Sequence, residues 1–95
     1  MQLEITRKAQ IDLVTLQEFG NANFGAAHTR RYLADMRDMF KTLRKWPEMA
    51  RLREDYGGTV RLHPFQSHLI FYRIEGDVLK VLRVTSRYQK WPEHL

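Results

Sequence analysis

The sequence predicts an α+β domain in which a hairpin of two helices packs on one face of a small, mainly antiparallel sheet, in the order β-α-α-β-β-β. Two segments before position 46 repeat apolar residues at helical spacing, and three segments after position 58 are rich in β-branched and aromatic residues. The chain has 95 residues, of which 43% are hydrophobic. That is enough for one core and too little for two, so we expect a single domain over residues 1–95.

The first quarter of the chain predicts one strand and one helix. Leu3 to Thr6 alternates apolar and polar residues as a strand does, and Thr6 can cap the helix that follows. Helical spacing then runs from Lys8 to Phe19, and the run Gly20 to Asn23 is expected to break the helix. The apolar positions of this helix are Ala9, Leu13, Leu16 and Phe19.

A second and longer helical pattern follows Gly25 and is expected to end at Trp46-Pro47. Polar and charged residues from Glu48 to Gly58 predict a loop. A strand is expected from Thr59 to His63, stopped by Pro64. The apolar positions of the second helix are Tyr32, Leu33, Met36, Phe40 and Leu43.

The segment Ser67 to Thr85 predicts a β-hairpin, because two runs of strand-forming residues flank the turn residues Glu75-Gly76-Asp77. After Arg87, the tail from Tyr88 to Leu95 is expected to lie back on the sheet. Trp91-Pro92 interrupts this tail. A hairpin alone is marginally stable, so the rest of the chain must cover it.

Alternation along the strands sorts the basic residues onto faces. The purer apolar sets, expected to face the helices, are Val60 and Leu62, then Ile70, Tyr72 and Ile74, then Leu82 and Val84. The opposite face would gather the candidate target-binding residues Arg61, His63, Arg73, Arg83 and Arg87, with Phe71 and Tyr88 among them. Guanidinium groups beside aromatic rings suit phosphates and stacked bases. The alternative is a solvated face whose arginines pair with Glu75, Asp77 or Glu93.

Composition narrows the class of function. A formal charge of +5 favours anionic partners such as nucleic acid or an acidic protein segment. The chain has no cysteine, which excludes thiolate catalysis and cysteine-ligated zinc and fits a reducing cytoplasm. We expect no metal, because no His or carboxylate residues have the spacing of metal ligands. We expect no cofactor, since a glycine-rich phosphate-binding loop is missing, and no contact with a membrane, since long apolar runs are missing. His68 is expected to be a hydrogen-bonded structural residue, and His28 and His94 to lie on the surface.

Several short motifs follow one another along nearly the whole chain. They are Ala9, Asp12-Leu13 and Leu16, then Gly25, Tyr32-Leu33, Phe40 and Pro47, then the string Ser67 to Arg73, Leu82-Arg83-Val84 and His94-Leu95. In these motifs the chain resembles the ParE branch of the ParE/RelE superfamily, the toxins of bacterial type II toxin-antitoxin pairs. The string Ser67 to Arg73 and the arginine of the next strand are the more specific part of the likeness.

The resemblance implies a helix hairpin on a small antiparallel sheet and a cognate, ParD-like antitoxin that wraps the hairpin and the sheet. It also implies a role in plasmid stabilization and inhibition of DNA gyrase. RelE-like relatives instead cut messenger RNA on the ribosome. In that alternative Arg61 and Arg83 would stabilise charge, and Tyr88, His63 or His94 would move protons. A third possibility is a degenerate, non-toxic module that only binds its antitoxin.

Two departures from the family pattern bear on this choice. Thr85-Ser86 stands where many ParE-like sequences have a Leu-His pair, so one candidate proton carrier is missing. Gln89-Lys90-Trp91 lacks the usual aspartate near the tail motif. A terminal tyrosine, which Tyr88 resembles, keeps the nuclease alternative open. The sequence therefore favours a non-catalytic toxin, in which we expect Arg83→Ala to weaken toxicity and leave the fold intact.

Overall fold

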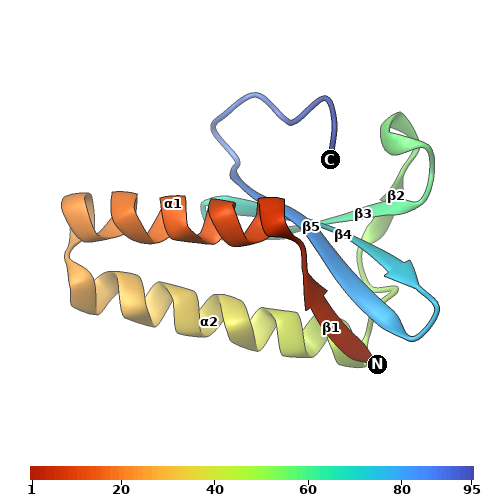
Figure 1. Ribbon diagram of the computed structural model, residues 1–95, viewed down its shortest axis with the longest axis horizontal. Coiled ribbons are helices and arrows are strands. Elements are labelled where there is room, and N and C mark those ends of the chain that lie inside the picture. The colour runs from red at the N-terminus through yellow and green to blue at the C-terminus, as the bar shows by residue number, and fades with distance from the viewer.

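A computed structural model describes residues 1–95 and confirms the predicted α+β architecture. The elements are β1 (Gln2–Ile5), α1 (Arg7–Phe24), α2 (Ala26–Lys45), β2 (Arg51–Arg53), a 3₁₀ helix (Glu54–Tyr56), β3 (Val60–Phe65), β4 (His68–Glu75) and β5 (Val78–Ser86). Both helices lie on one side of the sheet, and the C-terminal segment passes over the other side (Figure 1). The tip of the helix hairpin projects beyond the sheet.

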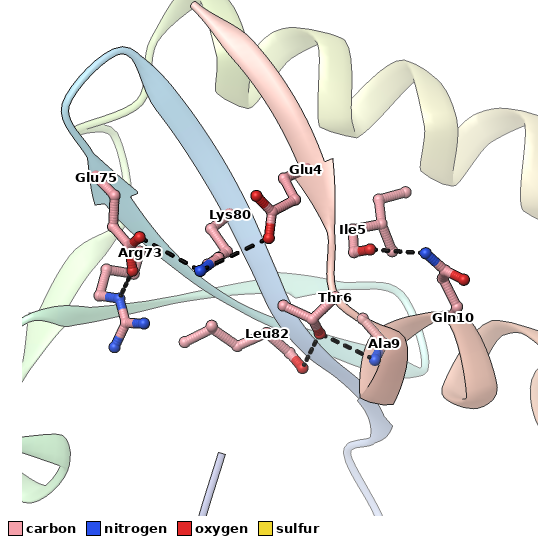
Figure 2. Close-up of polar contacts among 9 residues, drawn as sticks. All are labelled: Glu4, Ile5, Thr6, Ala9, Gln10, Arg73, Glu75, Lys80 and Leu82. Atoms are coloured by element: carbon pink, nitrogen blue, oxygen red, sulfur yellow. Dashed lines mark hydrogen bonds and ion pairs between the residues drawn. The ribbon is translucent and has the colours of Figure 1, made fainter.

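The sheet has five strands in the order β1-β5-β4-β3-β2. β1 runs parallel to β5, and all other neighbours are antiparallel. Thr6 joins the parallel pair to α1, because its Oγ1 accepts a hydrogen bond from the Ala9 amide at 3.2 Å and donates to the Leu82 carbonyl at 3.0 Å (Figure 2). The predicted cap at Thr6 is therefore confirmed.

The helix break expected at Gly20 to Asn23 is wrong, since α1 continues to Phe24. Gly20 is buried in the helix interior, where a Cβ atom would lie 2.6 Å from the Thr29 Oγ1 of α2. The glycine thus serves close packing between the two helices. The chain reverses at Gly25, whose φ of 87° suits a residue without a side chain.

Two strand predictions also need correction. The expected loop from Glu48 to Gly58 contains the short edge strand β2 and a turn of 3₁₀ helix. β3 runs through Pro64 to Phe65. A two-residue turn follows Phe65, which places Pro64 opposite Leu69 in a pair that exchanges no backbone hydrogen bonds. The nitrogen of Pro64 therefore faces away from β4. On the other side, β2 pairs with β3 only as far as Leu62, so Pro64 has no neighbouring strand there that would need its N–H.

The main core lies between the helices and the sheet. Phe40 and Leu43 of α2 pack there with Ile70, Tyr72 and other buried side chains of β4 and β5. The Tyr72 hydroxyl donates to the Pro47 carbonyl at 2.7 Å, which ties the end of α2 to the sheet. These contacts hold the base of the helix hairpin while its tip stays solvated.

A second, smaller core covers the far face of the sheet. Val60, Leu69, Phe71 and Leu82 form it, with Tyr56, Leu62, Trp91 and Leu95 packed against them. The rings of Trp91 and Phe71 meet edge to face, with centroids 6.0 Å apart. The tail therefore folds back on the sheet as expected, and the far face is largely apolar.

The predicted faces are correct for β4 and wrong for β3 and part of β5. Tyr72 pairs with Val81 but Phe71 pairs with Arg83, so Leu82 is an extra residue in a β-bulge. The bulge puts Val81 and Val84 in the main core and Leu82 in the far-face core. In β3 the predicted helix-facing residues are also reversed: Val60 and Leu62 pack on the far face.

Candidate functional site: the hairpin groove

A groove of about 730 Å³ opens between the helix hairpin, the turn joining β3 to β4, and the end of β5. We call it the hairpin groove. α1 contributes Asp12, Leu16 and Phe19, α2 contributes His28 and Tyr32, and the sheet side contributes His68, Arg83 and Ser86, with Tyr88 at the start of the tail. Segments from both ends of the sequence thus meet at one concave surface.

A forked ion pair forms one wall of the groove. Asp12 of α1 accepts hydrogen bonds from Arg83 Nε at 2.7 Å and Arg83 Nη2 at 2.9 Å. The same carboxylate accepts the backbone amide of Val84 at 2.9 Å. The hydrogen bond to Asp12 raises the pKa of the Arg83 guanidinium, so Arg83 stays charged. Asp12 and Arg83 therefore fix α1 to β5 at the bulge.

A tyrosine-histidine pair lines another part of the groove. Tyr32 Oη lies 2.7 Å from His68 Nδ1 and accepts the Ser67 amide at 3.2 Å. Burial lowers the pKa of His68 and raises the pKa of Tyr32, so both side chains are neutral at pH 7. The Tyr32 hydroxyl also donates to the Phe65 carbonyl at 3.4 Å, and the tautomer of His68 sets which of the two side chains donates in the Tyr32–His68 hydrogen bond. His68 is thus a hydrogen-bonded residue, as expected, and it anchors the β3–β4 turn to α2.

The rim of the groove is aromatic and exposed. Phe19, Phe24 and Tyr88 are 62%, 63% and 82% exposed. The rings of Phe19 and Phe24 are 6.3 Å apart, and Phe24 also meets the ring of His28 at 5.6 Å. Large apolar side chains gathered around a hollow are typical of a surface that a partner covers.

The structure brings three of the predicted target-binding residues to this region. Arg83 and Tyr88 line the groove. Arg87 is exposed beside them, and its backbone amide donates to the Ser67 carbonyl at 3.0 Å. Ser86, the departure from the family pattern, lies between them, and its Oγ accepts the Tyr88 amide at 3.2 Å.

The other three residues lie elsewhere, so the single basic face predicted from alternation is wrong. Arg61 and His63 pair with Tyr72 and Ile70 and therefore share the helix side of the sheet. Arg61 Nη1 donates to the Ala50 carbonyl at 2.6 Å and is 3.3 Å from that of Glu48. Burial lowers the pKa of His63.

Arg73 is on the far side, and its charge is already paired. Its Nε lies 2.6 Å from Oε2 of Glu75. The other carboxylate oxygen of Glu75, Oε1, lies 3.3 Å from Lys80 Nζ. Lys80 in turn approaches Glu4 of β1 at 3.6 Å, which completes a chain of four charged residues (Figure 2). The alternative of a face with scattered ion pairs, including one to Glu75, describes Arg73 better.

Reasoning from the sequence missed most of the groove. Asp12 was singled out only as part of the family likeness, and Tyr32 and Phe19 were counted only as apolar positions of the two helices, although Phe19 is mostly exposed. A signal was present for Phe19 and Phe24, because α1 carries apolar residues around its whole circumference. A helix of that kind has more apolar surface than one core can bury.

The structure offers no site for a bound metal ion and no membrane span. No group of three or more His, Asp or Glu residues is placed to hold a metal. Neither helix has the length and apolarity needed to cross a bilayer.

Comparison with known proteins agrees with the fold. Residues 3–91 match the family described as the ParE toxin of the type II toxin-antitoxin system, parDE. Because the match covers nearly the whole chain, this protein belongs to the ParE toxin family.

One solved structure similar to this chain is titled "Chromosomal ParDE TA system from P. aeruginosa". The TM-score is 0.79 at 22% sequence identity, over 90% of this chain and 95% of that chain. This likeness supports the fold. A search of curated protein sequences found no match.

Proposed function

We propose that this chain is a toxin that inhibits DNA gyrase and is neutralised by a cognate antitoxin seated in the hairpin groove. The observation that carries the antitoxin part is the exposed aromatic rim of Phe19, Phe24 and Tyr88 around the groove. Exposure of this apolar surface to water is unfavourable. A partner segment that buries it lowers the free energy of the complex by the hydrophobic effect. Membership in the ParE family supplies the partner class.

The chemistry of the groove favours an acidic, amphipathic segment. Apolar side chains of such a segment would pack on Phe19 and Leu16, and its carboxylates would face Arg87 and the outer edge of Arg83. Asp12 does not repel them, because its charge is matched by Arg83. The whole chain carries +5, so an acidic partner would also associate faster by electrostatic attraction.

For the target, the internal contacts of the arginines favour binding over cleavage. The ribonuclease alternative needs Arg61, Arg83 and Tyr88 around one phosphate. Arg61 binds the carbonyl of Ala50 and Arg83 binds Asp12, so these two guanidinium groups serve different elements. Together with the family, this supports gyrase inhibition by a non-catalytic toxin.

The antitoxin site can be tested with two equally exposed aromatic residues. Phe19→Glu places a charge on the groove rim, whereas Trp46→Glu alters a residue at the end of α2 that is 60% exposed and outside the groove. The partner is the product of the neighbouring reading frame, measured by calorimetry. We expect Phe19→Glu to weaken binding by about 30-fold or more and Trp46→Glu to change it by less than about threefold. Equal effects would move the antitoxin away from this groove.

The target can be tested independently. The chain is expressed without its antitoxin, and gyrase supercoiling and messenger-RNA 5′ ends are both measured. Trapped gyrase-DNA complexes with intact transcripts are the expected result. Codon-linked transcript cuts with normal supercoiling would instead identify a ribosome-dependent nuclease, and no effect in either assay would identify a non-toxic antitoxin-binding module.

A further inference from the structure

The positive charge of this protein is concentrated on one helix. α2 contains six arginines and lysines and two aspartates, so it accounts for four of the five net positive charges of the chain. The helix is only 20 residues long. Such a concentration on one rigid element is unexplained by the hairpin groove, which α2 borders with different residues.

Four of the basic residues line up along one flank of α2. Arg30, Arg37, Lys41 and Arg44 are separated by seven, four and three positions. At 3.6 residues per turn these spacings keep the four Cα atoms within an arc of about 60° and spread them over about 21 Å of helix axis. We call this row the α2 basic stripe.

The side chains of the stripe are available to a ligand. All four residues are exposed. Arg30 and Arg37 make no hydrogen bond or ion pair, and the Lys41 contact to Asp38 spans 3.8 Å between groups that are about three-quarters exposed. Arg44 uses only its Nε, which donates to the Met1 carbonyl at 2.9 Å. Weak surface pairing of this kind leaves the charges free to bind an anion.

We propose that the α2 basic stripe binds the phosphate backbone of duplex DNA. A row of exposed, unpaired or weakly paired cations along one helix complements a rigid row of phosphates, and binding would release the counterions condensed on those phosphates. Proteins that hold single strands add aromatic platforms on which bases stack. The stripe has none, because Tyr32 and Phe40, the aromatic residues of α2, lie half-buried or buried on the core side of the helix.

The stripe and the hairpin groove are separate surfaces of the same helix. His28, Thr29 and Tyr32 border the groove from α2 and lie roughly 90° or more around the helix from the centre of the stripe. A partner in the groove therefore leaves the stripe uncovered. DNA binding by the stripe is thus independent of which target or antitoxin the groove accepts.

The test measures binding of the 95-residue chain to a fluorescent 20-base-pair duplex of mixed sequence as a function of salt. The stripe variant replaces its four residues: Arg30→Gln, Arg37→Gln, Lys41→Gln and Arg44→Gln. A charge-matched control removes four exposed cations elsewhere: Arg7→Gln, Lys8→Gln, Arg51→Gln and Lys90→Gln. Both variants lose the same formal charge, so only the position differs. Circular dichroism establishes that both are folded.

We expect the stripe variant to lose about 30-fold or more in affinity near 50 mM salt. The slope of log K against log salt should become shallower by about 3 to 4, because each lost phosphate contact contributes about 0.9. The control variant should keep most of the affinity and nearly the whole slope. Equal losses in the two variants, or no binding by the unmodified chain, would overturn the proposal. Tighter binding to a single strand of the same length would overturn the assignment to duplex DNA.

Discussion

The arginines of the sheet and the arginines of α2 differ in what they contact. Arg53, Arg73 and Arg83 of the strands each pair with a carboxylate, and Arg61 binds backbone carbonyls. On α2, Arg30 and Arg37 have no partner. Arg53 and Arg73 find their carboxylates two positions further along the same segment, whereas Arg61 and Arg83 reach acceptors on other elements. The flank of α2 that carries Arg30 and Arg37 faces water instead. Of the five strand arginines only Arg51, on the edge strand β2, has no partner. Most of the free positive charge of these two regions is therefore on the helix, although alternation in the strands predicted it on the sheet.

The largest effect should follow from breaking the buried fork of Asp12 and Arg83. Asp12→Ala leaves the guanidinium of Arg83, which is 24% exposed, without its partner, and it also removes the acceptor of the Val84 amide. Loss of a mostly buried charged acceptor should lower the free energy of unfolding by about 2–4 kcal/mol. Urea denaturation followed by circular dichroism measures this value.

Arg83→Ala is the matching half of that experiment. Asp12 would keep the Val84 amide and could be solvated from the groove, so the cost should be smaller, about 1–2 kcal/mol. The earlier expectation that Arg83→Ala leaves the fold untouched is revised accordingly. Any loss of toxicity in this variant must be corrected for its stability. If Asp12→Ala proved as stable as the unmodified chain, paired and free arginines would not differ in their contribution to the free energy of unfolding.

A smaller effect comes from the two half-buried histidines, His63 and His68. Burial lowers the pKa of His68 and His63 below the ordinary value of 6.5, so below that pH the unfolded chain takes up protons that the folded chain refuses. The free energy of unfolding should therefore fall as the pH decreases from 7 toward 5. His68→Gln should reduce this fall in denaturation curves recorded across that range.

His94→Gln provides the control, because His94 is exposed near the end of the tail. Comparison of the two variants separates the effect of the half-buried His68 site from the loss of any one histidine. A fall of the same size in His68→Gln as in the unmodified chain would mean that His68 takes up protons equally in the folded and unfolded chain, and the lowered pKa of His68 in the fold would be wrong.

The smallest effect is expected where the charges are free. The double substitution Arg30→Gln with Arg37→Gln removes two exposed side chains that contact no acceptor, so the free energy of unfolding should change by less than about 0.5 kcal/mol. Thermal and urea denaturation beside Asp12→Ala would place the two classes of charged residue on one scale. A loss above about 1 kcal/mol would show that α2 uses these arginines for its own stability.

Local patterns were sufficient to predict most of the fold. Helical spacing gave both helices, the Thr6 cap gave the start of α1, and Gly76 gave the turn between β4 and β5. The errors have physical causes that a local pattern does not contain. A glycine in a helical segment predicts a break, but Gly20 is needed for close packing against Thr29 of α2. A proline predicts the end of a strand, but the nitrogen of Pro64 faces away from β4, so no ladder hydrogen bond is lost there.

The faces of the sheet were harder to predict because one residue reverses them. The extra residue Leu82 shifts the register of β5, and Arg61 faces the helices because of the register of β3. The groove was missed for a related reason. Asp12 meets Arg83, and Tyr32 meets His68, only when the helix hairpin is placed on the sheet. In each of these contacts 36 or more residues separate the partners.

The pairing of β1 with β5 sets the order in which this protein can fold. Gln2 lies beside Val78, 76 positions later, so closing that contact requires nearly the whole chain. Contacts of such long range form late and slow folding. At about 5–20 residues per second of synthesis, β1 waits several seconds for its partner. Asp12 and Arg83 depend on the same step, so a nascent toxin has no completed groove until β5 has been made.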